Sequence, residues 1–383
     1  MPAFKSRIES ALAERKTQGL NRSMNVVFAG NQSVLEHEGR RYINFSSNDY
    51  LGLANDQALV RAWQQGLSVY GSGSGASPMV TGFSAAHSNL EAALTEWLSY
   101  DRAILFGSGF SANQALLFTL LEKTDVLIQD RLNHASLMEA GMLSPAKMKR
   151  FKHNDIEHLK SLINSEGNHL VVTEGVFSMD GDCAPLADIA AVVDSHNAWF
   201  AVDDAHGIGV LGQSGGGSCE LATVKPELLV ITFGKAFGMS GAAILCDHAT
   251  GDFLTQFARH HVYSTAIPPA QAYALTHAVS MVQEQSWRRE KLSELSEVYR
   301  DCLSDLEGFV ETQTSIKPFV IGESELALQV ASACRQNGIW VTAIRPPTVP
   351  KGTSRLRITL TANHTNEQVK TLSMALKQAL GAL

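Results

Sequence analysis

A lysine, a carboxylate and an imidazole follow two apolar runs of the sequence. Lys235 comes just after residues 228–232, in a turn flanked by glycines. Asp203 ends the run 199–203, and His206 stands three positions later. A lysine amine can hold an aldehyde as a Schiff base, and a carboxylate can keep a pyridine nitrogen protonated, so that the ring withdraws electrons. The combination predicts pyridoxal 5'-phosphate chemistry, with His206 facing the phenolic oxygen of the cofactor.

Taken one at a time, these residues have plainer explanations. An isolated lysine is more often on the surface, but the place of Lys235 beside Thr232, at a strand end among glycines, favours a catalytic role. Burying Asp203 and Asp204 is costly unless a cationic partner is present. A pyridinium N–H is such a partner. A metal site and a helix cap are the alternatives, although no His/Cys ligand spacing accompanies the pair.

A glycine-rich stretch, residues 107–113, lies between a predicted strand and a predicted helix. Its small residues would let backbone amides approach a phosphate group at the start of the helix. The same stretch fits a dinucleotide fingerprint, and Asp130 stands near the position of a ribose-binding acid. An NAD-dependent dehydrogenase therefore stays an alternative at this point.

Three further residues have two interpretations each. His134 follows a predicted strand and would either stack on a planar ring or belong to a helix-capping loop. Ser178 would either hydrogen-bond a ring oxygen or form part of a turn. Arg357 shares one face of a strand with Arg355, where a guanidinium can hold a carboxylate by two hydrogen bonds. A surface ion pair is the alternative for Arg357.

These side chains need elements that bring them together. From residue 103 onward, apolar strands alternate with helices, which is typical of a mostly parallel sheet covered on both faces. Ligands bind such sheets at the carboxyl ends of the strands, where the motifs above fall. We predict an α/β fold with an N-terminal helix and β segment (1–50), a large cofactor-binding domain (51–284) and a small α+β domain (285–383). The basic run 147–152 is interpreted as a solvated helix end.

The composition argues against several other classes of function. The 383 residues are 45% hydrophobic, enough for a large core, and the net charge of −7 predicts no nucleic-acid surface. Five scattered cysteines, none in a C-x-x-C pair, indicate reduced thiols. Residues 1–18 are typical of a charged helix rather than a signal peptide, and no apolar run approaches the ~20 residues of a membrane span. We expect a cytoplasmic protein without membrane association.

Over nearly its full length the chain resembles the α-oxoamine synthases, which are fold type I pyridoxal phosphate enzymes. The resemblance rests on residues 44–52, 173–182, 202–207, 232–235, 263–265 and 345–350. It implies a mostly parallel central sheet in a large domain and a smaller α+β C-terminal domain. The run 345–350, Arg-Pro-Pro-Thr-Val-Pro, favours the branch of the family that makes 8-amino-7-oxononanoate in biotin synthesis.

The resemblance implies a role for each matching position. Lys235 would carry the cofactor and later move a proton, Asp203 would pair with the pyridine nitrogen, and His134 would stack on the ring; with His206 these are the implied catalytic residues. The residues implied to contact the cofactor are Gly109, Phe110, His134, Ser178, Asp203, His206, Thr232, Lys235 and Thr265. The residues implied to bind substrate are Arg22, Asn48, His134, Thr348 and Arg357. Thr265 would reach the phosphate of a neighbouring subunit, which implies a homodimer with a shared active site.

The resemblance also implies a reaction, the decarboxylative condensation of L-alanine with a pimeloyl thioester. The products would be 8-amino-7-oxononanoate, CO2 and a free thiol, with coenzyme A or an acyl carrier protein as the acyl carrier. The alternatives are sister synthases of the 2-amino-3-ketobutyrate ligase, 5-aminolevulinate synthase, serine palmitoyl or autoinducer type. Many relatives carry an arginine soon after the glycine-rich loop at residues 71–75, whereas residues 75–79 here have none. A substrate role for that arginine is therefore not carried over.

Overall fold

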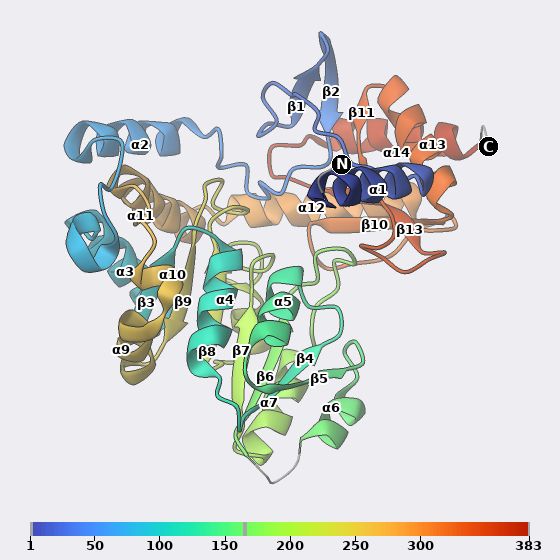
Figure 1. The fold of residues 1–383 in the computed structure, drawn as a ribbon. Coiled ribbons are helices and arrows are strands. Elements are labelled where there is room, and N and C mark those ends of the chain that lie inside the picture. Colours follow the sequence, from blue (N-terminus) through green and yellow to red (C-terminus); the bar gives the residue numbers. More distant parts are fainter. Residues whose placement is uncertain (1–2, 164–166, 382–383) are drawn as a thin grey trace.

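A seven-stranded sheet forms the centre of the chain, whose computed structural model describes residues 3–163 and 167–381. The strands lie in the order β3-β9-β8-β7-β6-β4-β5 (Figure 1). Their bounds are β3 Arg102–Phe106, β4 Val126–Asp130, β5 Lys147–Phe151, β6 His169–Glu174, β7 Trp199–Asp203, β8 Leu228–Thr232 and β9 Ala242–Cys246. Strand β9 is antiparallel to both of its neighbours, β3 and β8, and it runs opposite to the other six strands of this sheet. The mostly parallel sheet predicted from the alternating pattern is confirmed.

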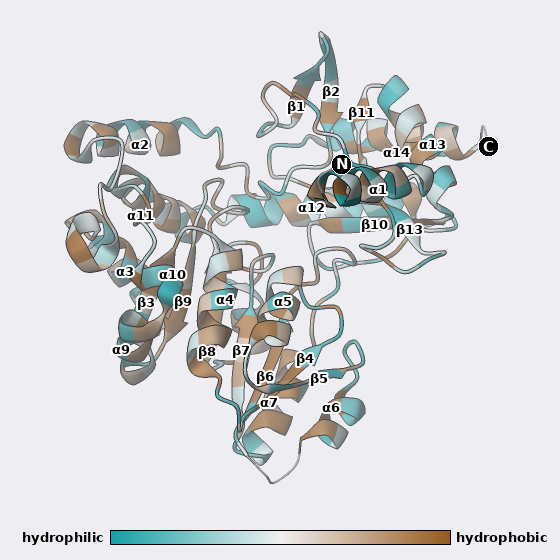
Figure 2. Cartoon of the chain, viewed as in Figure 1, coloured by the Kyte–Doolittle hydropathy of each residue, from teal (hydrophilic) through white to brown (hydrophobic). Residues whose placement is uncertain are grey.

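The strands are continuous apolar runs because both faces of the sheet are covered. Alternate residues of one strand enter different cores: Phe200 and Val202 of β7 belong to one buried cluster, and Ala201 belongs to the other. Helices cover the two faces: α4 Gly109–Leu120, α5 Ala135–Leu143, α6 Ile156–Leu162, α7 Leu186–Ser195, α8 Gly217–Ala222, α9 His248–Phe257 and α10 Arg259–Val262. Figure 2 shows the resulting band of hydrophobic residues along the sheet.

A helical layer packs beside the antiparallel edge of the sheet (Figure 1). It consists of α2 Gln57–Tyr70, the short π-helix Pro78–Gly82, α3 Ala85–Leu98 and α11 Pro269–Glu284. Gly66 allows α2 to approach α11 closely, because a Cβ there would stand 2.8 Å from the carbonyl oxygen of Ala270. Thr265, which the family resemblance places near a neighbouring subunit, is exposed and lies just before α11 of this layer.

The two ends of the chain meet in a second, smaller body with two three-stranded sheets. Strand β2 pairs in parallel with β11, so the N-terminal segment joins the C-terminal part. The elements are α1 Ala3–Thr17, β1 Val34–His37, β2 Arg40–Asn44, α12 Trp287–Leu303, β10 Ile316–Gly322, α13 Ser324–Gln336, β11 Ile339–Trp340, β12 Thr342–Ile344, β13 Ser354–Thr359 and α14 Asn366–Gly381. The division of the chain at residues 50 and 284 stays a prediction.

The interpretation of residues 147–152 as a helix end is wrong. Residues 147–151 form strand β5, which pairs in parallel with β4 at the edge of the large sheet. Phe151 is buried, whereas Lys147 and Arg150 face solvent, as is common on edge strands. The charges concealed a strand because an edge strand can keep most of its side chains hydrated.

Among the described helices, none is long and apolar enough to cross a membrane.

Candidate active site

A cavity of about 300 Å³ opens at the carboxyl ends of β4, β6, β7 and β8. Parallel strands deliver their final residues to one edge, so residues far apart in the sequence meet here. The lining residues are Asn48, Gly107, Ser108, Gly109, Phe110, Asn113, His134, Ser136, Glu174, Asp203, Ala205, His206, Thr232, Gly234, Lys235, Ser240 and Gly241. Eight of the residues predicted for the site therefore line a single cavity.

Lys235 stands in the turn after β8, and its side chain is only partly covered. Burial lowers the pKa of its amine, against the opposing influence of Asp203 and Glu174. The amine therefore loses its proton more readily than a lysine in water, as attack on an aldehyde carbon requires.

Asp203 and Asp204 are adjacent in sequence but serve different purposes. Asn113 donates from Nδ2 to Oδ2 of Asp203 at 2.6 Å, and the backbone N–H of Ala205 donates to Oδ1 at 3.1 Å. Asp204 turns away from the cavity and accepts from the backbone and the hydroxyl of Ser218 at 2.8 and 2.6 Å. Burial raises the pKa of Asp204 to about 7. Asp203 is thus the carboxylate available to a cationic ring, and Asp204 holds the following loop.

The start of α4 provides a cradle for a phosphate. Ser108 caps the helix, and the free N–H groups of its first turn, at Gly109 and Phe110, face the cavity. The Thr232 hydroxyl is buried and has no hydrogen-bond partner in the described part of the chain. A Cβ at residue 109 would stand 2.6 Å from Cγ2 of Thr232, so glycine keeps the cradle open. An unpartnered hydroxyl beside free amides fits the phosphate of pyridoxal phosphate.

Two histidines line the cavity, His134 in the loop after β4 and His206 in the loop after β7. His134 Nδ1 lies 2.7 Å from the Ser136 hydroxyl, and burial lowers its pKa, with Lys235 acting in the same direction and Asp203 opposing it. His206 Nδ1 lies 2.6 Å from the hydroxyl of Tyr50, and burial together with Lys235 brings its pKa well below the usual value. Both imidazoles are therefore neutral at physiological pH and can donate or accept a hydrogen bond.

Asn48 and Arg357 bring the small body into contact with the site. Arg357 on β13 donates from Nη1 to Oδ1 of Asn48 at 3.0 Å and from Nε to the carbonyl oxygen of Ser178 at 2.6 Å. Asn48 itself lines the cavity. Arg357 is 8% exposed, so the guanidinium is not a surface ion-pair partner. It can hold a carboxylate close to Lys235.

Five predicted residues do not line this cavity, and one of them, Arg357, reaches it through Asn48. Ser178 and Thr348 line a neighbouring cavity of about 460 Å³, together with Arg355, which pairs with Asp180. Thr265 and Arg22 are exposed and belong to neither cavity. Thr265 lies in the loop between α10 and α11, and Arg22 follows α1.

Asn113, Tyr50 and Glu174 are site residues that the sequence did not single out. Asn113 lies one turn into α4, and it is the polar member of a buried face whose other residues are alanine and leucine. Tyr50 reaches His206 across the sequence, and nothing local indicated that contact. Glu174 ends a wholly buried strand. Because burying a carboxyl group is costly, such a residue usually has a function or a hydrogen-bond partner.

Asp130 argues against dinucleotide binding. Its Oδ1 accepts from the backbone N–H of Leu132 at 2.8 Å, and its Oδ2 accepts from that of Asn154 at 2.9 Å. The ring of His153 also contacts both oxygens. The carboxylate is therefore engaged in holding its own loops, and a ribose would have to displace these contacts. Within residues 3–163 and 167–381, no group of three or more potential ligands is placed to hold a metal ion.

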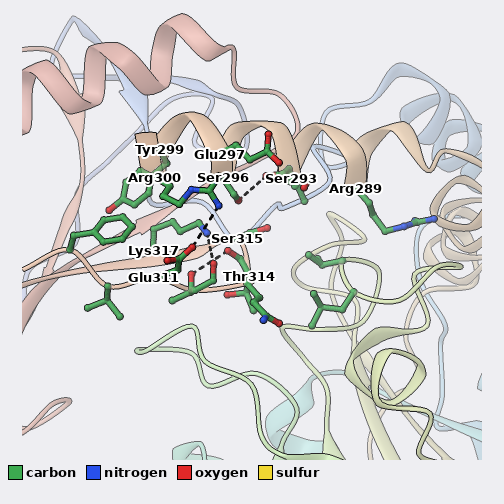
Figure 3. A pocket seen from close by; sticks show the side chains of 17 residues that line it. Arg289, Ser293, Ser296, Glu297, Tyr299, Arg300, Glu311, Thr314, Ser315 and Lys317 are labelled. Carbon is green, nitrogen blue, oxygen red and sulfur yellow. Dashed lines mark hydrogen bonds and ion pairs between the residues drawn. The ribbon is translucent and has the colours of Figure 1, made fainter. Parts of the chain in front are cut away.

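A separate cavity of about 350 Å³ is lined by α12 and the segment 309–317 (Figure 3), and Val210 and Leu211 also line it. It contains another buried lysine, Lys317, which donates to the carbonyl oxygen of Thr312 at 2.8 Å. None of the residues predicted for catalysis lines it. We therefore assign the chemistry to the cavity at Lys235.

Comparisons with known proteins agree with this geometry. The pattern of the family described as aminotransferase class I and II matches residues 40–376. The chain is 92% identical over its full length, and over all of the relative, to a protein of Vibrio campbellii named 8-amino-7-oxononanoate synthase. Serine palmitoyltransferase of Sphingomonas wittichii superposes with a TM-score of 0.92 at 30% identity, covering 100% of this chain and 98% of that one. An 8-amino-7-oxononanoate synthase structure from Francisella tularensis gives a TM-score of 0.78 at 29% identity, covering 89% and 98%.

Proposed function

We propose, from the premise that the chain belongs to the aminotransferase class I and II family, that it joins L-alanine to a pimeloyl thioester with loss of CO2. The product would be 8-amino-7-oxononanoate, as the name of the 92%-identical relative indicates. The cofactor is pyridoxal 5'-phosphate. The observation that carries the proposal is the single cavity that joins Lys235, Asp203 and the phosphate cradle at Gly109 and Thr232.

When bound, the cofactor supplies an electron-withdrawing ring that stabilises negative charge on the carbon next to the substrate amine. Lys235 Nζ would hold the cofactor through its aldehyde group and would be free to act as a base once alanine is bound. Asp203, held by Asn113 and Ala205, would accept a hydrogen bond from the ring nitrogen and keep it protonated. The amides of Gly109 and Phe110 and the Thr232 hydroxyl would hold the phosphate.

The remaining residues act on the substrate. Arg357 and Asn48 hold the alanine carboxylate, so that the α-hydrogen faces Lys235. The released amine of Lys235 takes the α-proton and later returns a proton after CO2 has left. On the cofactor side, His134 would cover the ring face, and His206, oriented by Tyr50, would contact the phenolic oxygen.

The proposal includes a homodimer. Thr265 is exposed and lies outside the cavity of its own chain, which supports a contact with the phosphate of a second subunit. Thr348, which lines the neighbouring cavity, and the exposed Arg22 are assigned to the acyl substrate on coenzyme A or a carrier protein, whereas Ser178 is assigned to the ring oxygen of the cofactor. All five cysteines are free, which supports a cytoplasmic location.

Substrate profiling of the purified holoenzyme tests the proposed function. With pimeloyl thioester as the acyl donor, alanine should give 8-amino-7-oxononanoate and stoichiometric CO2, whereas glycine and serine should react at least about tenfold more slowly. A preference for glycine or serine would instead indicate that the chain has the activity of one of the sister synthases. Absence of a visible absorption band sensitive to borohydride would contradict the pyridoxal assignment itself.

A further inference from the structure

Glu174 is a buried carboxyl in the active-site cavity that the mechanism above does not use. It ends β6 and is 3% exposed. Its Cα is the register partner of Asp203 on β7, so the two side chains leave the same face of the sheet. Both side chains line the cavity that holds Lys235. Two carboxyl groups therefore stand side by side next to one amine.

The surroundings of the two carboxyls are unequal. Asp203 accepts hydrogen bonds from the Asn113 side chain and the Ala205 backbone, and both stabilise its charge. Among the described residues, the backbone N–H of His134 is the comparable donor to Glu174. Two neighbouring carboxyl groups in a buried site are costly to ionise together. Glu174, which has fewer donors to stabilise a charge, is the carboxyl that keeps its proton.

The other charges around Glu174 lead to the same assignment. Burial raises the pKa of Glu174 well above its usual value, and the charge of Asp203 adds to this effect. Lys235 favours the anion, whereas Asp130 on β4 opposes it. The other titratable or charged groups that act on Lys235 or His206 are Asp204, which directly follows β7, Arg357 on β13 and His134.

We propose that Glu174 is a positioning residue that acts as a neutral carboxylic acid, donating a hydrogen bond into the cavity and adding no negative charge beside Lys235. This inference adds a role for Glu174 to the proposed function, and the activity assay that tests it rests on that function. An ionised Glu174 would place a second negative charge beside Lys235 and strengthen the hold of the amine on its proton. Lys235 would then be a poorer nucleophile and a poorer base.

The proposal has a consequence for pH dependence. Glu174 is neutral at pH values below its raised pKa and becomes an anion as the pH rises through that value. Activity should therefore decline on the basic side, where the new anion holds the proton on Lys235. Glutamine has the same shape and cannot ionise, so Glu174→Gln should lack this decline.

The test compares Glu174→Gln and Glu174→Ala holoenzymes with the exposed control Glu96→Gln. We expect Glu174→Gln to keep kcat/KM within about threefold of the wild type at neutral pH and to lose the basic decline. Glu174→Ala should lose about 100-fold or more, the scale of a positioned hydrogen-bonding group. A loss of 100-fold in Glu174→Gln, or an unchanged basic decline, would overturn the proposal.

A spectroscopic readout separates this inference from the proposed reaction. The visible band of the cofactor joined to Lys235 is titrated with pH in the absence of substrates. In the wild type, the band should show an additional transition on the basic side that is absent from Glu174→Gln and present in Glu96→Gln. The same transition in Glu174→Gln would contradict the proposal even if the enzyme used other substrates. A wild type that made no 8-amino-7-oxononanoate would instead contradict only the proposed function.

Discussion

Two lysines of this chain lie in cavities, Lys235 at the end of β8 and Lys317 in β10, and burial lowers the pKa of both amines. Lys317 is 3% exposed and donates to the carbonyl oxygen of Thr312 (Figure 3). Its nearest opposing charge is Glu311, which already pairs with Arg300. Lys235 is partly open to its cavity and stands beside Asp203 and Glu174.

The comparison shows that a desolvated amine does not by itself identify a catalytic lysine. Both environments make the proton easier to lose, and within the described part of the chain both cavities contain unpartnered hydroxyls, of Thr232 in one and of Tyr299 and Ser315 in the other. The cavity at Lys235 differs because two buried carboxyl groups, Asp203 and Glu174, and the first amides of α4 also line it. Carboxyl groups and anion-binding amides that converge on one amine, rather than a desolvated lysine alone, indicate a reactive site.

The largest expected effect is loss of activity on changing Lys235. Lys235→Ala removes both the holder of the cofactor aldehyde and the base, so product formation should fall by on the order of 10⁴-fold or more. The matched control, Lys317→Met, should keep kcat within about twofold. Product formation with alanine and pimeloyl thioester measures both variants. Equal losses in the two variants would mean that the cavities had been assigned wrongly.

A smaller effect is expected from Asn113, which supports Asp203. Asn113→Ala removes the hydrogen bond of 2.6 Å to the Asp203 carboxylate. Hydrogen bonds to charged groups contribute about 1.5–3 kcal/mol, so affinity for pyridoxal phosphate should fall by about 10- to 100-fold. The next residue offers a control, because Gln114 faces outward and contacts Glu139. Titration of the apoenzymes with cofactor should show no change for Gln114→Ala, and an equal loss there would exclude a specific role for Asn113.

The effect expected for Lys317 is on folding stability and leaves activity nearly unchanged. Its pKa is lowered to about 8 in the folded chain, so the unfolded chain binds more protons between about pH 8 and the usual lysine pKa of 10.5. Stability of the wild type should therefore rise with pH across this window, relative to Lys317→Met, by up to about 3 kcal/mol. Urea unfolding of both proteins at several pH values measures the difference. A difference independent of pH would indicate that Lys317 is not desolvated.

Local patterns were sufficient to predict the sheet and the residues at its carboxyl edge. The apolar runs of β6, β7 and β8 are long enough to be buried on both faces, and a parallel sheet brings their final residues together. Lys235, Asp203 and His206 could therefore be placed from sequence. The same patterns failed at β5, where lysine and arginine on a sheet edge looked like a helix end.

Residue types were enough to predict the chemistry, because a lysine at a strand end and the small residues before α4 indicate an aldehyde-holding amine and a phosphate cradle. The identity of the cooperating side chains depends on the fold. The contacts of Asp204 with Ser218, of Tyr50 with His206 and of Arg357 with Asn48 join segments far apart in sequence. The fold also buries Glu174 beside Asp203 and Lys235, and burial and neighbouring charges, rather than residue type, raise its pKa.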